Sequence, residues 1–268
     1  MPAEGPRSFT AIILAAQRDG KLDPLAERAG VTHKSLAPIL GRPLLDYVLE
    51  ALMAVPGLSR IRICIEPQAV EAVRAITDGV MGVPVDFVAA KPTITESAYA
   101  SAEGVAEPMV ITTADNVNLT PGAIRQMVDS IAQGADAAVA LATKGAVLAA
   151  HPEGQRRFYQ FSDDAYSNCN LYALSGPKGL RAAETFREGG QFAKNPKRLI
   201  RAFGLLNVLL VRYKLVSLEG AMKRASKRFG FRIDPVVLAD GAHAIDVDNA
   251  RTYDIAEIIL KEKAAARG

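Results

Sequence analysis

Short runs of apolar residues alternate with amphipathic segments along the first half of the chain. The first run, 9–16, is an almost continuous apolar stretch, as expected for a strand that is buried on both faces of a parallel sheet. Such runs occupy residues 9–16, 61–65, 83–89, 109–113 and 137–143. The segments between them are expected to be helices, at 43–53, 68–76, 95–105 and 121–133. This alternation predicts an α/β fold with three α/β/α layers around a mostly parallel sheet.

The second half of the chain is less regular. Its patterns predict strands at 157–161, 168–173 and 233–238, a strand that ends at 244–248, and helices at 196–211, 216–229 and 251–266. No linker rich in Gly, Ser or Pro separates these segments from the first half. We therefore expect one domain over residues 1–268, with a lobe inserted in the second half.

Composition narrows the class of protein. Hydrophobic residues make up 49% of the chain and charged residues 23%, which is ordinary for a globular protein and excludes a disordered, collagen-like or coiled-coil chain. The net charge of +3 is too small to indicate nucleic acid as a partner. Two cysteines, Cys64 and Cys169, are too few for a disulfide framework or a zinc site. We expect both to be free thiols.

Neither a membrane span nor a secretory leader is expected. The apolar run 203–211 is about half as long as a membrane-spanning helix, and residues 1–8 lack the pattern of a signal peptide. The sequence therefore favours a cytoplasmic protein. The stretch 199–212 is unusually apolar and has no basic rim of its own. We expect it to form a core or dimer helix rather than a membrane-docking face.

Candidate chemistry lies where the predicted strands end, because ligands of open parallel sheets bind outside the carboxyl ends of the strands. Leu14, Ala15 and Ala16 end the first strand. The small side chains of the two alanines let a ligand approach the backbone, whose amides can face phosphate oxygens. A plain strand-to-loop transition is the alternative. The next loop, 17–33, is long for a compact domain, and long loops are usually functional or mobile. Neither a G-x-G-x-x-G motif nor a P-loop is present.

Three aspartates near predicted strand ends are candidate metal ligands. Asp115 ends the fourth strand, where a carboxylate is a natural Mg²⁺ ligand, although Asp-Asn also favours turns. Asp246 and Asp248 are two positions apart, so on a strand both point to one face and could complete the metal site. Solvated charges before the last helix are the alternative. Lys34 follows the long loop, and most lysines are solvated surface charges.

Together these segments resemble the sugar-phosphate and alcohol-phosphate nucleotidyltransferases, and most of all the MobA-like NTP transferases. The similar segments are Leu14-Ala-Ala16, Lys34-Ser-Leu36, Gly41-Arg-Pro-Leu-Leu45, Thr113-Ala-Asp-Asn116 and Ile245-Asp-Val-Asp248. The family pattern is L-A-[AG]-G-x-G-x-R-[ML], then P-K-x-L, then G-[KR]-P-[LM]-[LIV], then a strand that ends in a metal-binding Asp. The resemblance covers residues 9–125 and returns near 168–173 and 244–258.

The resemblance implies a Rossmann-like nucleotidyltransferase fold of GT-A type with an acceptor-side insertion. The nucleotide-binding half would span 9–145 and the acceptor-binding lobe 146–243. The part at 244–268 would supply the metal-ligand strand and the C-terminal helix.

Roles for single residues follow from the same resemblance. Lys34 matches the lysine that contacts phosphate oxygens, and Arg18 is the candidate for the arginine of the catalytic loop, with Lys21 as its competitor. Asp115 matches the first Mg²⁺ ligand. Asp248 is the better match for the second ligand, with Asp246 as the alternative. Further candidates are nucleotide-binding residues Leu14, Ala15, Ala16, Gln17, Ser97 and Ala114, and acceptor-binding residues Asn116 and Asn170.

The chain departs from the family pattern in its first loop. Gln17 replaces the first glycine of the loop, and His33 stands where proline usually precedes the lysine. Residues 18–21 imitate G-x-R-M only loosely. These departures keep a non-catalytic nucleotide-binding regulator open as an alternative.

The activity implied by the resemblance is Mg²⁺-dependent transfer of a nucleotidyl group from an NTP to a small phosphorylated acceptor, with release of pyrophosphate. The Leu-Ala-Ala opening is more similar to members that use pyrimidine nucleotides, which favours CTP over UTP and GTP. A phosphoglycerate-like compound, another headgroup phosphate or a sugar phosphate is the expected acceptor. We expect no nucleic-acid partner, and a homodimer stays open.

A nucleotide-sugar glycosyltransferase of related fold is the second alternative. It would need an Asp-x-Asp pair near the fourth strand, and the segment Asp115-Asn-Val-Asn118 lacks the second carboxylate.

Overall fold

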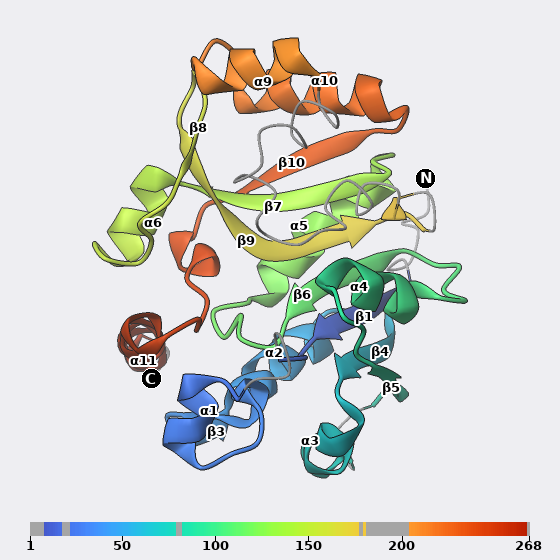
Figure 1. Ribbon diagram of the computed structural model, residues 1–268, viewed down its shortest axis with the longest axis vertical. Helices are drawn as coiled ribbons and strands as arrows, with labels where there is room; N and C mark the ends of the chain where they lie inside the picture. Colours follow the sequence, from blue (N-terminus) through green and yellow to red (C-terminus); the bar gives the residue numbers. More distant parts are fainter. Residues whose placement is uncertain (1–7, 18–21, 79–81, 177–178, 181–203, 267–268) are drawn as a thin grey trace.

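The computed structural model describes residues 8–17, 22–78, 82–176, 179–180 and 204–266. Its centre is an eight-stranded sheet in the order β10-β7-β9-β6-β1-β4-β5, with β8 paired to β9 (Figure 1). The strands are β1 (Phe9–Leu14), β4 (Leu58–Ile65), β5 (Val85–Ala89), β6 (Met109–Thr113), β7 (Ala137–Thr143), β8 (Tyr159–Gln160), β9 (Ala165–Leu174) and β10 (Ile233–Leu238). A short hairpin, β2 (Pro38–Ile39) and β3 (Arg42–Pro43), lies outside this sheet.

The sheet is parallel except at β9. β1 pairs in parallel with β4 and β6, β4 with β5, and β7 with β10. β9 runs antiparallel to β6, β7 and β8. Because β9 is reversed, its first half lies at the same edge as the carboxyl ends of β1 and β6. That edge carries the candidate site.

Helices cover both faces of the sheet, so the expected three-layer α/β/α architecture is confirmed. One face packs against α2 (Leu44–Met53), α3 (Val70–Thr77), α5 (Pro121–Ala132), α6 (Lys144–Ala150) and α11 (Ala250–Ala265). The other face packs against α4 (Ile94–Ala102) and α10 (Leu218–Phe229). Two further helices are α1 (Pro24–Ala29) and α9 (Leu205–Arg212), and the short 3-10 helices are η2 (Lys34–Leu36), η3 (Pro67–Ala69) and η5 (Gly241–Ala244).

Burial on both faces explains the continuous apolar runs in the sequence. In β1, the side chains of Phe9, Ala11 and Ile13 belong to the core under one layer of helices. Ile12 points to the core on the opposite side. All four are fully buried, so the strand has no solvated face on which a polar residue would be favoured.

Several helices and strands differ from the sequence-based expectation. The segment 17–33 contains α1, whose N-cap Asp23 accepts a hydrogen bond from the backbone N–H of Leu25, and which ends at Gly30 with φ 67°. α6 was not expected, and the predicted strand at 157–161 is reduced to β8. Residues 196–203 of one predicted helix lie outside the described residues.

The stretch 199–212 was expected to form a core or dimer helix, and its described part does not lie in the core of the chain. This part forms α9, and none of the residues of this helix is buried. The expectation of a core position failed because apolar content alone does not say whether a partner surface is available. Within the described residues, no helix is long and apolar enough to cross a membrane. Cys64 and Cys169 are buried free thiols, as expected.

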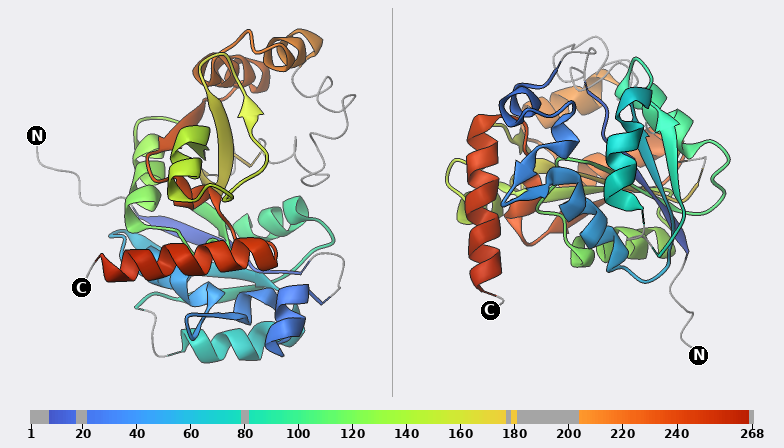
Figure 2. Two further views of the ribbon diagram at one scale, coloured as in Figure 1. Left: turned by 90° about the vertical axis from the view of Figure 1, so that its left-hand side faces the viewer. Right: turned by 90° about the horizontal axis from the view of Figure 1, so that it is seen from below.

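The last helix closes the side of the molecule next to the candidate site. α11 lies beside the segment that contains α1 in both views of Figure 2. The Tyr253 hydroxyl donates a 2.6 Å hydrogen bond to the carbonyl of Pro38, and Val247 and Ala256 share an apolar cluster with Leu25 and Ile39. The C-terminal segment is thereby fixed next to the loop that carries Lys34.

Candidate functional site

The centre of the site is an ion pair between the ends of two distant segments. Lys34 begins η2, and Asp115 follows the carboxyl end of β6. The lysine Nζ lies 2.5 Å from Asp115 Oδ2 and 3.8 Å from Asp248 Oδ1. Burial lowers the pKa of Lys34, but the charge and hydrogen bond of Asp115, together with the charges of Asp248 and Asp23, outweigh burial and raise it above the ordinary value. Lys34 is therefore a fixed cation and not a solvated surface charge.

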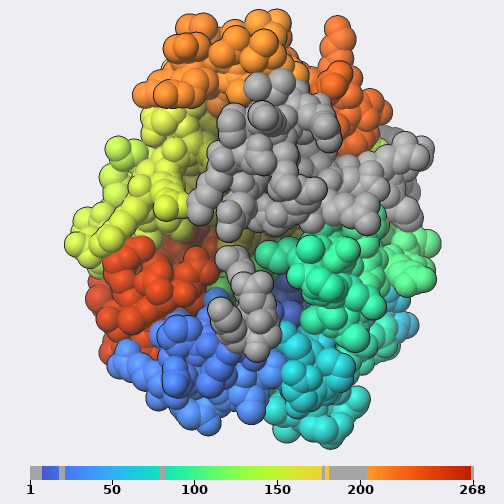
Figure 3. All heavy atoms as spheres, in the orientation of Figure 1, coloured from blue at the N-terminus to red at the C-terminus, as the bar shows by residue number. Residues whose placement is uncertain are grey.

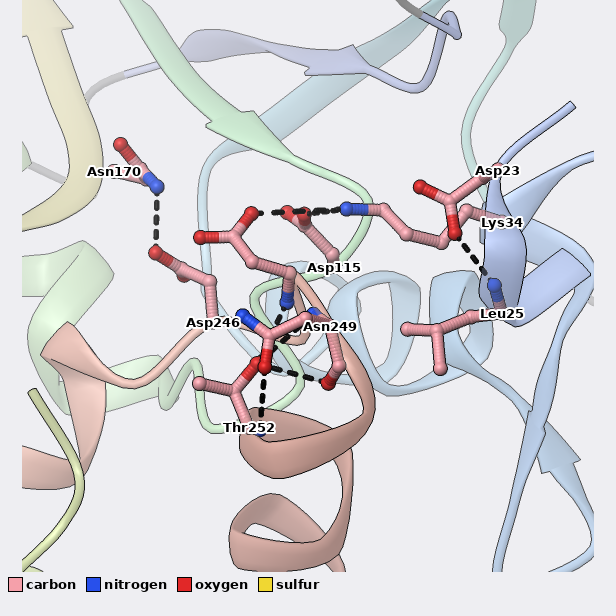
Figure 4. A network of polar contacts seen from close by, with 9 residues as sticks. Asp23, Leu25, Lys34, Asp115, Asn170, Asp246, Asn249 and Thr252 are labelled. Carbon is pink, nitrogen blue, oxygen red and sulfur yellow. Dashed lines mark hydrogen bonds and ion pairs between the residues drawn. The ribbon is translucent and has the colours of Figure 1, made fainter. Parts of the chain in front are cut away.

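Asp246 supplies a third, more deeply buried carboxylate. Its side chain is buried, and its Oδ2 accepts a 2.5 Å hydrogen bond from Nδ2 of Asn170. Burial, reinforced by the charges of Asp115 and Asp248, raises the pKa of Asp246 well above its ordinary value. Figure 4 shows Lys34 and Asn170 approaching this group of carboxylates from opposite sides.

The segment 245–248 is not the strand that the sequence predicted. The backbone N–H of Asp248 donates to the carbonyl of Asp246 at 3.0 Å, a contact between residues two apart that an extended strand cannot make. The two side chains consequently do not share a face. The side chain of Asp246 is buried, whereas the side chain of Asp248 is 56% exposed.

Backbone contacts still hold both aspartates at the site. The N–H of Val247 donates to the carbonyl of Asp115 at 3.1 Å, and Nδ2 of Asn118 donates to the carbonyl of Ile245 at 3.3 Å. On the far side, Asn249 caps α11 in a reciprocal capping box with Thr252. The segment is therefore tied to the end of β6 and to the first turn of α11.

Asn170 reaches Asp246 because β9 bulges. Leu141 of β7 pairs with Asn168 and Val139 with Tyr172, so three residues of β9 lie opposite one residue of β7. Within this bulge Asn170 has φ 45°, in the left-handed region that Asn tolerates better than most residues. Nδ2 of Asn168 donates to Oδ1 of Asn170 at 2.9 Å. The bulge and this hydrogen bond orient the Asn170 amide toward Asp246.

Gln17, which departs from the family pattern, closes the first loop. Its backbone N–H donates to Oε1 of Glu66 at 2.8 Å, and its Nε2 donates to the carbonyl of Thr32 at 2.8 Å. Its Oε1 accepts from the N–H of Asp23 at 3.0 Å. Gln17 thus joins the start of the loop to its end. Arg18 and Lys21, the two candidate loop cations, lie outside the described residues.

The other expected site residues line the same edge but already have internal partners. The N–H of Ala15 donates to the carbonyl of Cys64, and that of Ala114 to the carbonyl of Leu14, while Ala16 follows as a partly exposed residue. Ser97 is buried and accepts from the N–H of Lys91 at 2.9 Å.

Asn116 is buried, and its Nδ2 donates to Oγ1 of Thr112 and to the carbonyl of Cys169. Both hydrogens of that amide are thereby used within the protein. These two hydrogen bonds join Asn116 to β6 and β9.

Three residues near the site had not been predicted from the sequence to be site residues. Asp23, the N-cap of α1, lies close enough to Lys34 to raise its pKa, and its position before Pro24 is a helix-start signal that could have been found. His33 Nε2 lies 3.2 Å from Glu66 Oε2, below the first loop. No sequence pattern links His33 and Glu66, because they meet only through the fold.

The oxygen donors of this site fit a hard divalent cation. Oδ1 of Asp115 and Oδ1 of Asp246 are buried without a hydrogen-bond partner in the described structure. No group of three or more His, Cys, Asp or Glu in the described part of the chain is already arranged to hold a metal ion. Mg²⁺ needs only one or two carboxylates when phosphate oxygens and waters complete its shell. The donor set therefore suits Mg²⁺ bound together with a phosphorylated ligand.

Three solved structures illustrate the similarity of this fold to known proteins. A hypothetical transferase from Thermus thermophilus is 26% identical, with a TM-score of 0.74, over 92% of this chain and 99% of that one. CMP:2-keto-3-deoxy-manno-octonic acid synthetase in complex with CTP is 13% identical, with a TM-score of 0.61, over 96% and 99%. The 4-diphosphocytidyl-2C-methyl-D-erythritol synthase of Anaerococcus prevotii is 11% identical, with a TM-score of 0.58, over 96% and 99%. The fold is that of the Rossmann-like nucleotidyltransferases.

The sequence assigns the family within this class. The model of the MobA-like NTP transferase domain matches residues 11–216, well over half of the chain. The chain belongs to the MobA-like NTP transferase family, and the expected resemblance is confirmed. No curated protein matched the chain.

Proposed function

We propose that this protein is a Mg²⁺-dependent nucleotidyltransferase that transfers a nucleoside monophosphate, with CMP favoured, from an NTP to a small phosphorylated acceptor. The observation that carries the proposal is the meeting of Lys34 and three aspartates at the carboxyl edge of β1 and β6. This edge is where open α/β sheets bind ligands. Two structures of the same fold carry the names of enzymes that handle CTP or cytidine diphosphate products, which supports CTP as the donor.

Charge balance explains why a metal belongs in this proposal. When ionised, Asp115, Asp246 and Asp248 carry three negative charges, and Lys34 compensates one of them. A triphosphate would be repelled by the remainder. Asp115 would hold Mg²⁺ together with Asp248 or Asp246. The bound cation would neutralise phosphate charge and polarise the α-phosphate toward attack.

The protein's own residues would position the reactants. Lys34, which lies at the same edge of the sheet as Asp115, would contact phosphate oxygens of the donor as a point charge. Asn170, already fixed by Asn168, would hold the Asp246 side chain in place. The acceptor phosphate is ionised at neutral pH and attacks directly, so no strong general base is needed and catalysis rests on positioning and charge neutralisation.

Pyrophosphate release tests the proposed activity. Each of CTP, UTP, GTP and ATP is incubated with Mg²⁺ and a panel of phosphoglycerate-like compounds, headgroup phosphates and sugar phosphates. We expect release that requires one NTP and one acceptor together, with CTP the preferred donor. Tight binding of a nucleotide without turnover on any acceptor would indicate the non-catalytic regulator instead. In parallel reactions with a nucleotide sugar in place of the NTP, sugar transfer would indicate a glycosyltransferase.

A further inference from the structure

α9 presents an apolar stripe that the rest of the described structure does not cover. The residues Leu205, Leu206, Leu209, Tyr213 and Leu215 are between 40% and 68% exposed. At roughly 100° per residue, the positions from Leu205 to Tyr213 fall within about 100° of the helix circumference. They form one continuous stripe, and Leu215 lies just beyond the helix end.

A basic helix lies beside this stripe. α10 contacts α9, and both helices lie together at one end of the molecule in Figures 1 and 2. The buried residues of α10, Leu218 and Ala225, are on its inner side. Its exposed residues include Lys223, Arg224 and Lys227. Figure 3 shows α9, in light orange, forming the outer surface at this end.

Positive charge is concentrated in α9, α10 and the turn between them. Residues 204–230 contain six basic residues and one acidic residue, a net charge of +5. They are Arg212, Lys214, Lys223, Arg224, Lys227 and Arg228 against Glu219. The whole chain carries +3, so the rest of it carries −2. The charge of the chain is therefore unevenly distributed, and its positive end coincides with the exposed apolar stripe.

We propose that α9 and α10 form a docking surface for an anionic lipid bilayer. Exposed leucines at one side of a helix can enter the headgroup region, and nearby Lys and Arg side chains are attracted to anionic lipids. A second copy of the chain fits this surface poorly, because two faces of net charge +5 would repel each other. The basic rim that residues 199–212 lack in the sequence is supplied by α10 through the fold. This proposal does not depend on the proposed activity.

Vesicle flotation of the full chain tests the docking surface. The probes are vesicles of phosphatidylcholine mixed with phosphatidylglycerol, and vesicles of phosphatidylcholine alone. We expect the protein to float with the anionic vesicles only, and the bound fraction to fall as NaCl is raised, because salt screens surface charge. Absence of flotation with the anionic vesicles at low salt would overturn the proposal.

Two double variants test whether vesicle binding depends on this surface in particular, and not on exposed apolar or basic residues in general. Leu206→Ser/Leu209→Ser removes apolar area, and Arg224→Glu/Lys227→Glu reverses charge. Each should lower the bound fraction about tenfold or more, given about 1 kcal/mol for each basic residue at an anionic surface. Matched controls are Ile258→Ser, at an exposed apolar position of α11, and Arg156→Glu/Arg157→Glu, at two exposed arginines elsewhere. Thermal melts confirm that every variant is folded.

Two kinds of result would contradict the docking surface, one from the control variants and one from the oligomeric state. Equal losses in the control variants, or unchanged binding in the surface variants, would overturn the proposal. So would light scattering that shows a dimer which Leu206→Ser/Leu209→Ser converts to a monomer, with no vesicle binding by the parent. In that case the stripe is a self-association face.

Discussion

Lys34 and Asp115 are 81 positions apart in the sequence, yet Nζ of the lysine lies 2.5 Å from Oδ2 of the aspartate. The same Nζ lies 3.8 Å from Oδ1 of Asp248, so the lysine is placed between the two aspartates. Among the residues that the structure describes, Lys34 is paired with both Asp115 and Asp248 and compensates their charge. A divalent cation bound at Asp115 would therefore neutralise the same carboxylate charge that Lys34 neutralises.

The first prediction concerns Lys34→Ala. Without metal, this variant removes the cation that lies within 4 Å of Asp115 and Asp248, so we expect a loss of about 1–2 kcal/mol in unfolding free energy after allowance for solvent screening. Mg²⁺ should restore part of the loss and should stabilise the variant more than the parent. Thermal melts with and without MgCl₂ measure both effects.

A surface lysine provides the control for this experiment. Lys223 pairs with Glu219 one helical turn away and is highly exposed, so Lys223→Ala should change stability by less than about 0.5 kcal/mol and should not alter the response to Mg²⁺. If Lys34→Ala behaves like this control, Lys34 does not compensate the carboxylates.

The second prediction concerns Asn170, whose amide donates to Asp246. Asn170→Ala removes the donor from a buried oxygen, and we expect a cost of about 1–3 kcal/mol. Asn170→Asp should cost more at neutral pH than at acidic pH, since it places a second carboxylate where the amide is 2.5 Å from Asp246 Oδ2. Urea unfolding at the two pH values measures the difference. A pH-independent cost of Asn170→Asp would contradict the contact.

The third prediction uses two glycines at the contact between α6 and η5. A Cβ atom at Gly241 would lie 2.2 Å from backbone atoms of Ala146 and Val147, whereas one at Gly145 would meet nothing within 4 Å. Gly241→Ala should therefore destabilise the protein by several kcal/mol, on the order of an overpacked core, and should displace the segment that carries Asp246.

Gly145→Ala is the matched control. Gly145 lies within α6, where alanine is favoured over glycine by about 0.5–1 kcal/mol, so the variant should be as stable as the parent or slightly more stable. Differential scanning calorimetry on both variants decides the point. Equal melting temperatures for the two variants would contradict the close packing of η5 on α6.

The fourth prediction concerns pH and His243. Burial lowers the pKa of this imidazole from 6.5 to about 4. Between these values the unfolded chain binds a proton that the folded chain excludes, so unfolding free energy falls as pH is lowered through this range. The contribution of His243 is about 3 kcal/mol. His243→Gln should flatten the pH dependence of stability in this window, and an unchanged slope would show that the imidazole is not buried in neutral form.

The parts of the fold and of the site that depend on local sequence pattern could be predicted from the sequence. Buried parallel strands leave continuous apolar runs, so β1, β6 and the position of Asp115 at a strand end could be predicted. The family motifs then connected Lys34 to the same site. These features are local in sequence, even though the residues themselves meet only in three dimensions.

The parts that failed depend on tertiary contacts. The alternation of Asp246 and Asp248 resembles a strand, but hydrogen bonds to Asp115 and Asn118 impose an irregular segment instead. The left-handed conformation of Asn170 results from the register of β7 and β9. The exposure of α9 could not be predicted, because its leucines would suit a core equally well.

The most direct test of the site is nucleotide binding by titration calorimetry. CTP, UTP, GTP and ATP are each titrated with and without Mg²⁺ into the parent and into Asp115→Asn, with Asp46→Asn, a partner of Arg42 on α2, as the control. We expect one triphosphate, CTP by preference, to bind only with Mg²⁺. Asp115→Asn should weaken that binding about a hundredfold or more, and the control should bind like the parent. Binding that needs no Mg²⁺ and survives Asp115→Asn would contradict the assignment of this edge of the sheet as the metal and nucleotide site.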